Sequence, residues 1–251
     1  MFKKLVPVTK QRHQNITLAP VIDYSFANKL HSAPLAIIEF PVACAHLPIV
    51  FLKEQEKMFP HLFMGIIPGT NLCVDEKGSW IGGYIPLAVK RYPFSFVRSD
   101  DKLILSIDEG CGLFSVRTGE TLFDITGKQG PELDRAVDLL EKYQAGLAQA
   151  EKFCAVLNEF DLFGPLKIQL ERKDMKPIVL KGLFYINEIK LRELSDDKYL
   201  QLRHQEMIQF IYYHLLSLQN MNLLQVRNRT LARKAFSDEG ASIPDSFNFG
   251  D

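Results

Sequence analysis

Short apolar runs separated by turn-forming residues fill the first half of the chain. Runs of this length that are rich in β-branched and aromatic residues are typical of strands. The predicted strands are residues 35–40, 48–52, 63–67, 72–74, 94–98 and 103–107, and residues 42–46 are predicted to form a helical turn. The intervening loops, such as 68–71 and 99–102, are too short for a parallel crossover, so we expect an antiparallel sheet.

The spacing of apolar residues changes after Gly130, where they begin to recur every three or four positions. Pro131 suits the first position of a helix, and Glu132 and Asp134 complement the helix dipole in its first turn. The pattern predicts an amphipathic helix over residues 131–160, with a glycine at position 146 that can loosen it.

Two further strands and a second helix are predicted in the last third of the chain. The strands, 166–170 and 178–180, lie on either side of a charged turn at 171–176. Apolar residues then trace one face of a helix over 195–222, and Ser195 is a suitable residue to cap it.

These elements predict an α+β fold: an antiparallel sheet from the first half, packed against two or more amphipathic helices in a single domain. At 251 residues the chain can bury a full hydrophobic core without disulfides. We expect the domain to span residues 1–228. Residues 229–251 are polar and lose periodicity, which predicts a mobile C-terminal tail.

The only tryptophan, Trp80, lies in a segment that combines glycines with a basic and aromatic run. Residues 75–78 are of types that favour a turn, and they lie between apolar segments, which predicts a local hairpin. Pro86 can begin a short helical turn that must end before Pro93, because proline disfavours helix at the residue that precedes it. The two residues before Pro93 therefore lie at a corner.

Several motifs occur in a characteristic order along the chain. They are Asn71-Leu72-x-Val74-Asp75-x-x-Gly78-x-Trp80, Ile85-Pro86-x-x-x-x-Arg91-Tyr92-Pro93-Phe94, Ile107-Asp108-Glu109, Leu122-Phe123-Asp124, Gly182-Leu183-Phe184-Tyr185-Ile186-Asn187-Glu188, Leu194-Ser195-Asp196 and Ile211-Tyr212-Tyr213-His214-Leu215-Leu216-Ser217-Leu218. In order and spacing this set resembles the SapC family of soluble bacterial proteins, up to Leu224. The chain departs from the family pattern at Cys73, where an aromatic residue is expected, and at Lys90, where arginine is more usual.

The resemblance implies a functional context rather than a reaction. Members of the family are often encoded beside outer-membrane receptors and flavoproteins that look like tryptophan halogenases, and no established catalytic residues come with the family. The resemblance therefore implies an accessory protein in a surface-receptor or flavoenzyme-associated system. It does not extend to the peptide-transporter permease of the same name, which would need several uninterrupted membrane spans that this sequence lacks.

Charge and composition narrow the functional classes to which this protein can belong. Thirty basic and thirty acidic residues cancel, which argues against a general binder of nucleic acid or of anionic membranes. No secretion signal is recognisable at the N-terminus, and we expect a cytoplasmic protein. The four cysteines show no CxxC spacing and lie among apolar residues, so we expect buried free thiols and no metal site.

The best candidate site combines an aromatic platform with basic and acidic groups: Trp80, Arg91, Tyr92, Arg98, Asp108 and Glu109. Guanidinium groups beside aromatic rings can bind a carboxylate, and Asp108 with Glu109 could act as an acid–base pair. Alternatively, Trp80 is part of the core, and Asp108 is a turn residue that satisfies backbone donors. A third possibility is a buried structural ion pair between Arg91 and Asp108.

No motif for a cofactor, a phosphate loop or a catalytic nucleophile is present. The leading hypothesis is a non-catalytic accessory or binding protein without a cofactor, which recognises a peptide, an amino-acid-like ligand or a partner protein. The alternative is an enzyme that acts on such a substrate, with Arg91 binding its carboxylate and Asp108 or Glu109 as the acid–base group. An oligomer that forms through the helix containing Tyr212 is a further possibility, although this face also fits plain core packing.

Overall fold

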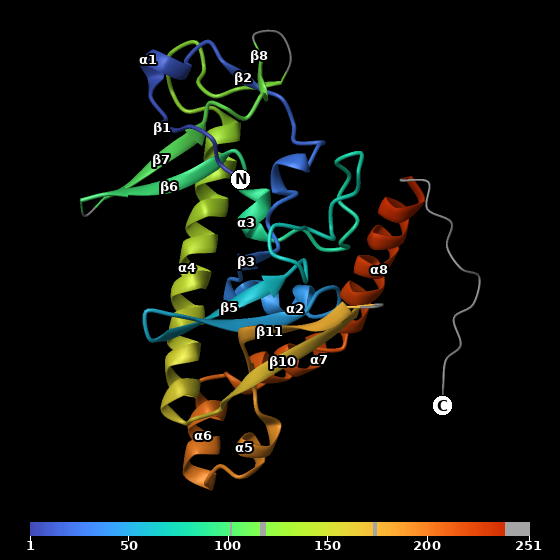
Figure 1. The fold of residues 1–251 in the computed structure, drawn as a ribbon. Helices are drawn as coiled ribbons and strands as arrows, with labels where there is room; N and C mark the ends of the chain where they lie inside the picture. Colours follow the sequence, from blue (N-terminus) through green and yellow to red (C-terminus); the bar gives the residue numbers. More distant parts are fainter. Residues whose placement is uncertain (101, 116–118, 173–174, 239–251) are drawn as a thin grey trace.

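The computed structural model describes residues 1–100, 102–115, 119–172 and 175–238. In chain order the elements are β1 (Leu5–Pro7), α1 (Lys10–His13), β2 (Thr17–Leu18), η1 (Ser25–Ala27), β3 (Ser32–Pro34), η2 (Ile37–Glu39), α2 (Phe40–Ala43), β4 (Ile49–Glu54), β5 (Lys57–Phe63), α3 (Leu87–Lys90), β6 (Phe94–Ser99), β7 (Lys102–Asp108), β8 (Phe114–Ser115), β9 (Glu120–Thr121), α4 (Pro131–Glu159), β10 (Phe163–Arg172), β11 (Met175–Ile186), α5 (Glu188–Arg192), α6 (Asp196–His204), α7 (Ile208–Ser217) and α8 (Asn220–Asp238). The predicted α+β class is confirmed (Figure 1).

The described strands form three antiparallel sheets. The largest has the order β10-β11-β4-β5-β3, so it draws on both halves of the chain rather than mostly on the first. A second sheet, β1-β7-β6, contains the predicted hairpin of β6 and β7, which projects from the body (Figure 1). The third, β8-β2-β9, consists of two-residue strands.

Helix α4 runs the length of the molecule and joins its two ends (Figure 1). Its 29 residues correspond to about 44 Å. Leu133 and Leu140 near its start pack under the β1-β7-β6 sheet, whereas Phe153 and Leu157 belong to the main core beneath the five-stranded sheet. At Gly146 the helix continues, and an added Cβ would lie 2.7 Å from the Cβ of Ala36, so the glycine permits close packing rather than loosening the helix.

Three predicted strands are wrong. Within residues 35–40, Ile37–Glu39 form η2 and Phe40 begins α2, because the Glu39 carboxylate accepts the Ala36 N–H at 3.0 Å and thereby caps a helical turn. Of the strand predicted at 63–67, only Phe63 is in a strand, because β5 ends at that residue. Residues 72–74 contribute only a single bridge between Val74 and Trp80, across the turn that was predicted at 75–78.

The helix predicted over 195–222 is divided into α6, α7 and the start of α8. The first break coincides with Glu206, which has a φ of +56°, a left-handed conformation that a helix does not accommodate. Ser195 occupies the N-cap position of α6, although its side chain donates and accepts no cap hydrogen bond. Helix α8 continues past residue 228 to Asp238, and residues 239–251 lie outside the described part of the chain.

Two buried polar side chains attach α7 to the central sheet. His214 accepts the Ile186 N–H through Nε2 at 3.0 Å, so its Nδ1 donates to the Ile49 carbonyl oxygen at 3.0 Å. The Ser217 hydroxyl accepts the Ile49 N–H at 2.9 Å and donates to the His214 carbonyl oxygen. These bonds satisfy backbone groups of β4 and β11 that would otherwise be buried without partners.

Candidate functional site

The corner that carries Arg91 is built by short-range structure. Pro86 occupies the N-cap position of α3, which ends at Lys90, so the predicted helical turn is confirmed. The Tyr92–Pro93 peptide bond is cis, and β6 begins immediately afterwards at Phe94. The side chain of Arg91 at this corner lies against Tyr143 of α4.

The guanidinium of Arg91 is held by two aromatic rings and two hydrogen bonds. Its Cζ atom lies 5.1 Å from the ring centroid of Phe2 and 5.5 Å from that of Tyr143. Nε donates to the Ala88 carbonyl oxygen at 3.3 Å, and Nη1 donates to the Ser95 hydroxyl at 2.7 Å. Since a guanidinium has five N–H donors, these bonds leave three of them for another acceptor.

No carboxylate neutralises Arg91 within the described residues. The predicted ion pair with Asp108 is absent, because Asp108 directs its oxygens at other donors. Arg91 is partly buried, and its desolvation lowers its pKa, an effect that the nearby Tyr143 opposes. A cation that is removed from water without a counter-ion favours the arrival of an anion.

Tyr92 and Trp80 have structural contacts. Tyr92 is buried and stacks on Phe26 with ring centroids 3.9 Å apart, and its hydroxyl donates to Asp108 Oδ2 at 3.4 Å. Trp80 is partly buried, its Nε1 donates to the Tyr84 carbonyl oxygen at 2.9 Å, and its ring meets Tyr24 edge-on at 5.7 Å. The hydrogen bonds and ring contacts of both aromatic residues are therefore made within the protein.

Asp108 ties the N-terminal segment to the end of β7. The residue is fully buried, and its carboxylate accepts the backbone N–H groups of Lys3, Lys4 and Gly110 at 2.8, 2.7 and 3.0 Å. Desolvation would raise its pKa, but these donors and the Tyr92 hydroxyl outweigh it and lower the pKa overall. Asp108 thus satisfies backbone donors, and by holding Lys3 it also fixes the neighbouring Phe2 over Arg91.

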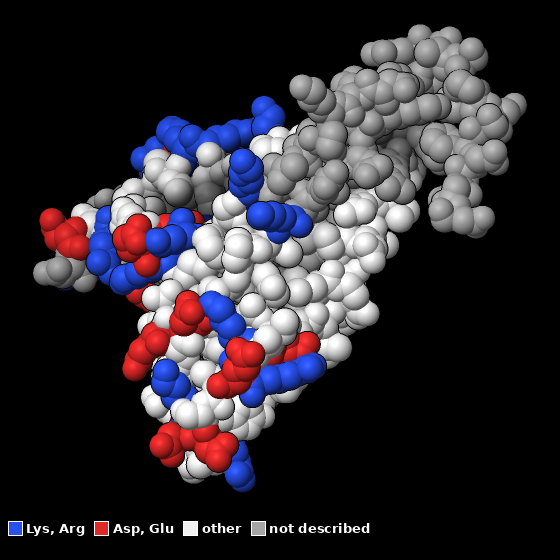
Figure 2. Space-filling view, turned by 60° about the horizontal axis from the view of Figure 1, so that its bottom comes forward, with Lys and Arg blue, Asp and Glu red and all other residues white. Residues whose placement is uncertain are grey.

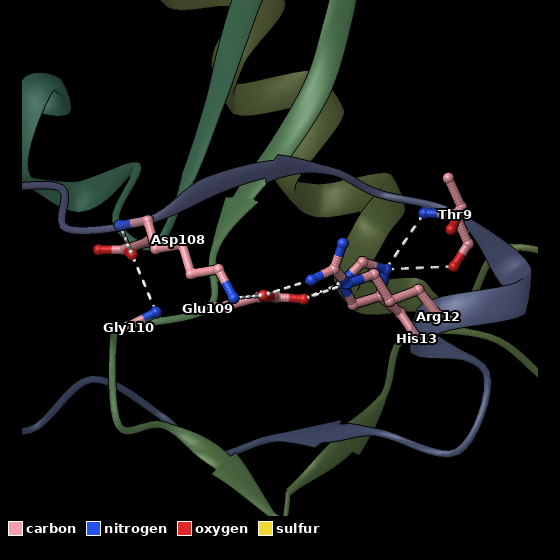
Figure 3. A network of polar contacts seen from close by, with 7 residues as sticks. Thr9, Arg12, His13, Asp108, Glu109 and Gly110 are labelled. Atoms are coloured by element: carbon pink, nitrogen blue, oxygen red, sulfur yellow. Dashed lines mark hydrogen bonds and ion pairs between the residues drawn. The ribbon is translucent and has the colours of Figure 1, made fainter.

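Glu109 points away from Asp108, toward α1 (Figure 3). Its carboxylate forms ion pairs with Lys4, at 2.9 Å, and with Arg12, and hydrogen bonds from these residues lower its pKa. Nδ1 of the buried His13 lies 3.1 Å from both the backbone nitrogen and the carbonyl oxygen of Thr9, and its Nε2 is 3.8 Å from Glu109 Oε1. Figure 3 shows this network as a link between α1 and the end of β7.

The structure therefore divides the six candidate residues among several places. Arg98 is exposed on the projecting hairpin, opposite Leu103, and has no contact with Arg91 among the described residues. The two rings around Arg91 come from distant segments and were not predicted from the sequence. Glu39 was not predicted either, although a carboxylate in an apolar run is a signal that could have identified a buried acid.

Glu39 is the last residue of η2 and contacts the first residue of α3. It is 2 % exposed, and its Oε1 accepts the Tyr84 hydroxyl and the Leu87 N–H at 2.9 and 2.8 Å. Burial raises its pKa, which the surrounding donors partly oppose. Because its second oxygen caps η2 through Ala36, Glu39 connects η2 to α3.

The described residues contain no group of three or more His, Cys, Asp or Glu side chains that could hold a metal ion. Cys44, Cys73, Cys111 and Cys154 are free thiols, and burial raises the pKa of each. No described helix is long and apolar enough to cross a membrane.

Helix α7 contains no charged residue, and Tyr212 and Leu216 are exposed on it. Leu223 and Val226 continue exposed apolar positions into α8. Figure 2 shows that charged residues gather toward one side of this view and leave a broad area without them. The oligomer contact through the Tyr212 helix stays a prediction.

Comparison with known proteins gives one match. The family model described as SapC matches residues 8–224, which include Arg91, Tyr143 and all six candidate residues and begin after Phe2. No curated protein matches the chain, and no solved structure matches it.

Proposed function

This chain belongs to the SapC family, and we propose that it is a non-catalytic binding protein that recognises the carboxylate of a peptide or amino-acid-like ligand at Arg91. The observation that carries this proposal is the environment of Arg91. Its guanidinium is partly buried between Phe2 and Tyr143, has no described carboxylate partner, and retains three N–H donors.

A carboxylate suits these donors for geometric and electrostatic reasons. The planar guanidinium matches two carboxylate oxygens, and charge-assisted hydrogen bonds of this kind are roughly twice as strong as neutral ones. The rings of Phe2 and Tyr143 exclude part of the solvent, which strengthens the attraction between opposite charges. They also offer apolar surface to the side chain of an amino acid.

The geometry supports binding rather than acid–base catalysis. Asp108 uses both oxygens for backbone donors, and Glu109 is paired with Lys4 and Arg12. Glu39 is engaged by Tyr84 and by two backbone N–H groups. Each carboxylate near the corner therefore already has a structural role.

The carboxylate could belong to a free peptide or to the C-terminus of a partner protein, and the family's genetic surroundings favour a surface-receptor or flavoenzyme-associated partner. Our proposal includes a cytoplasmic location, which the free thiols at all four cysteines support because such thiols fit a reducing compartment. The exposed face of α7 is the candidate contact for an oligomer or for the body of a partner.

The test compares N-acetylated dipeptides that end in a free carboxylate with the same peptides ending in an amide, by isothermal titration calorimetry. We expect the carboxylate forms to bind and the amide forms to bind at least about tenfold more weakly, a difference of roughly 1.4 kcal/mol. Arg91→Gln should abolish the preference. Arg98→Gln, the same substitution at an exposed arginine of β6, should keep it.

Equal binding of the two peptide forms, or an unchanged preference in folded Arg91→Gln, would refute the assignment. Circular dichroism and thermal unfolding confirm that each variant is folded before it is titrated. If Arg98→Gln removes the preference as well, the carboxylate is attracted by general positive charge rather than held at Arg91.

A further inference from the structure

A second binding site is suggested by a pocket where α4 crosses the hairpin of β4 and β5 (Figure 1). The pocket has a volume of ≈ 200 Å³ and is lined on its apolar side by residues that include Phe59, Pro60 and Leu147. Typical sites for drug-sized ligands begin at about 300 Å³, so this pocket suits a short chain or a single side chain.

The polar side of the pocket carries an unneutralised negative charge. Glu54 lines the pocket, and no described lysine or arginine lies within ion-pair distance of it. Glu151 also lines the pocket, but Lys57 neutralises it at 2.6 Å. The net charge presented to a ligand is therefore one carboxylate, which favours a monovalent cation.

His61 lies beside Glu54 and is buried. Its Nε2 is 3.6 Å from Glu54 Oε1, and its buried Nδ1 has no hydrogen-bond partner. Burial lowers the pKa of His61 to about 4, so the ring is neutral at pH 7 and the two groups do not form an ion pair.

A cation can bridge these two groups. When the ring proton is on Nδ1, the Nε2 lone pair and the Glu54 carboxylate are both acceptors, 3.6 Å apart. A nitrogen about 2.8 Å from each of them would donate one N–H to each, which is normal hydrogen-bond geometry. An ammonium group has three such donors, and the Gln144 amide in the pocket wall offers a third acceptor.

From this arrangement we propose that the pocket binds a primary alkylamine in its protonated form, such as the side chain of a lysine residue. The ammonium group donates to Glu54 and His61, and the alkyl chain lies against Phe59 and Leu147. This site is separate from the carboxylate site at Arg91 and does not depend on it.

The test uses n-butylammonium chloride as the probe and butan-1-ol as its neutral counterpart, followed by the backbone amide signals of Leu147 and Ala148 in ¹H–¹⁵N NMR spectra. A ligand of five non-hydrogen atoms is expected to bind with a Kd on the order of 1 mM. Glu54→Gln should weaken binding at least about tenfold. Glu56→Gln, on the same hairpin but paired with Lys53, should leave binding unchanged.

Three results would overturn the proposal: no saturable shift in the wild-type protein, equal binding of butan-1-ol, or wild-type affinity in Glu54→Gln. Glu54 is exposed at the end of β4, so its substitution is not expected to impair folding. Arg91→Gln should bind the amine like the wild type. The failure of one site can therefore be recognised independently of the other.

Discussion

Replacing Asp108 with asparagine is expected to release the N-terminal segment from the body of the protein. Asp108 is fully buried, and its two oxygens accept three backbone N–H groups at 2.7–3.0 Å and the Tyr92 hydroxyl at 3.4 Å. Asparagine has nearly the same shape but only one acceptor oxygen. Its NH₂ group would replace one of the two carboxylate oxygens. It would then face an N–H donor that this oxygen accepts in the wild type.

The expected loss follows from those contacts. If the asparagine oxygen takes the place of Oδ1, it keeps the bonds from Lys4 and Gly110, and the NH₂ group then opposes the Lys3 N–H. A hydrogen bond to a charged acceptor contributes about 1.5–3 kcal/mol, and an unsatisfied buried donor costs about 1–3 kcal/mol. Because Lys3 is exposed and can recruit water, we expect a net loss of about 2–3 kcal/mol.

The assay is thermal and urea unfolding, together with hydrogen exchange of the Lys3, Lys4 and Gly110 amides. For a chain of this length the melting temperature should fall by roughly 5–10 °C, and the three amides should exchange faster. Asp124→Asn is the matched control: Asp124 Oδ1 also accepts backbone N–H groups, from Thr126 and Lys128, but it is exposed and should cost less than about 1 kcal/mol.

The pH dependence provides a second measure of the same interaction. The pKa of Asp108 is lowered in the folded state, so its contribution is complete above the pKa of the unfolded state and is lost as the pH falls through the folded value. The free energy of unfolding of Asp108→Asn should therefore fall less than that of the wild type as the pH is lowered through this range. Stability within about 0.5 kcal/mol of the wild type, with unchanged exchange of the three amides, would refute the reasoning.

Further predictions concern packing, a buried histidine and the binding corner. Gly146→Ala should destabilise the protein by about 1–3 kcal/mol in urea unfolding, because its Cβ would lie 2.7 Å from that of Ala36; a stabilised variant would contradict this. Burial lowers the pKa of His214 to about 3, so unfolding should become easier as the pH falls below about 6.5, where only the unfolded chain takes up the proton. Urea midpoints between pH 7 and pH 5 should show a shallower slope in His214→Gln, and an equal slope would exclude this role. Phe2→Leu should weaken carboxylate binding at Arg91 two- to fivefold by calorimetry, because it removes a cation–π contact of about 0.5–1 kcal/mol; unchanged affinity would show that the ring is dispensable.

Elements whose pattern is local were predictable from the sequence. The hairpin of β6 and β7 alternates apolar and polar residues on both sides of a four-residue turn signal, and α4 begins at a proline followed by acids. The corner at Arg91 was predictable for a similar reason, because two prolines limit the helical turn. In each case nearby residues decide the backbone conformation.

Elements that depend on distant contacts were not predictable in this way. Residues 35–40 have strand propensity, but Glu39 binds backbone donors of its own turn and of α3, so tertiary contacts override propensity. The apolar period continues through Glu206, where the chain nevertheless leaves the helix. A hydrophobic pattern alone does not report such a break.

In the candidate site, too, some features follow from the local sequence and others depend on distant contacts. Arg91 was identified from sequence, but its two aromatic neighbours, Phe2 and Tyr143, come from the N-terminal segment and from α4. The pairing of Arg91 with Asp108 was plausible from charge alone and is excluded by geometry. The partners of a charged residue depend on tertiary structure, which its sequence neighbours do not specify.

The central claim, that Arg91 binds a carboxylate, is tested most directly by the NMR signals of its own side chain. Its Nε–H resonance can be assigned by its disappearance in Arg91→Lys and followed while an N-acetylated dipeptide is added. If Arg91 binds the carboxylate, this resonance will shift and saturate at the concentration that gives binding in calorimetry, and the Arg98 resonance will stay unchanged. Shifts of both arginines in parallel, without saturation, would contradict it.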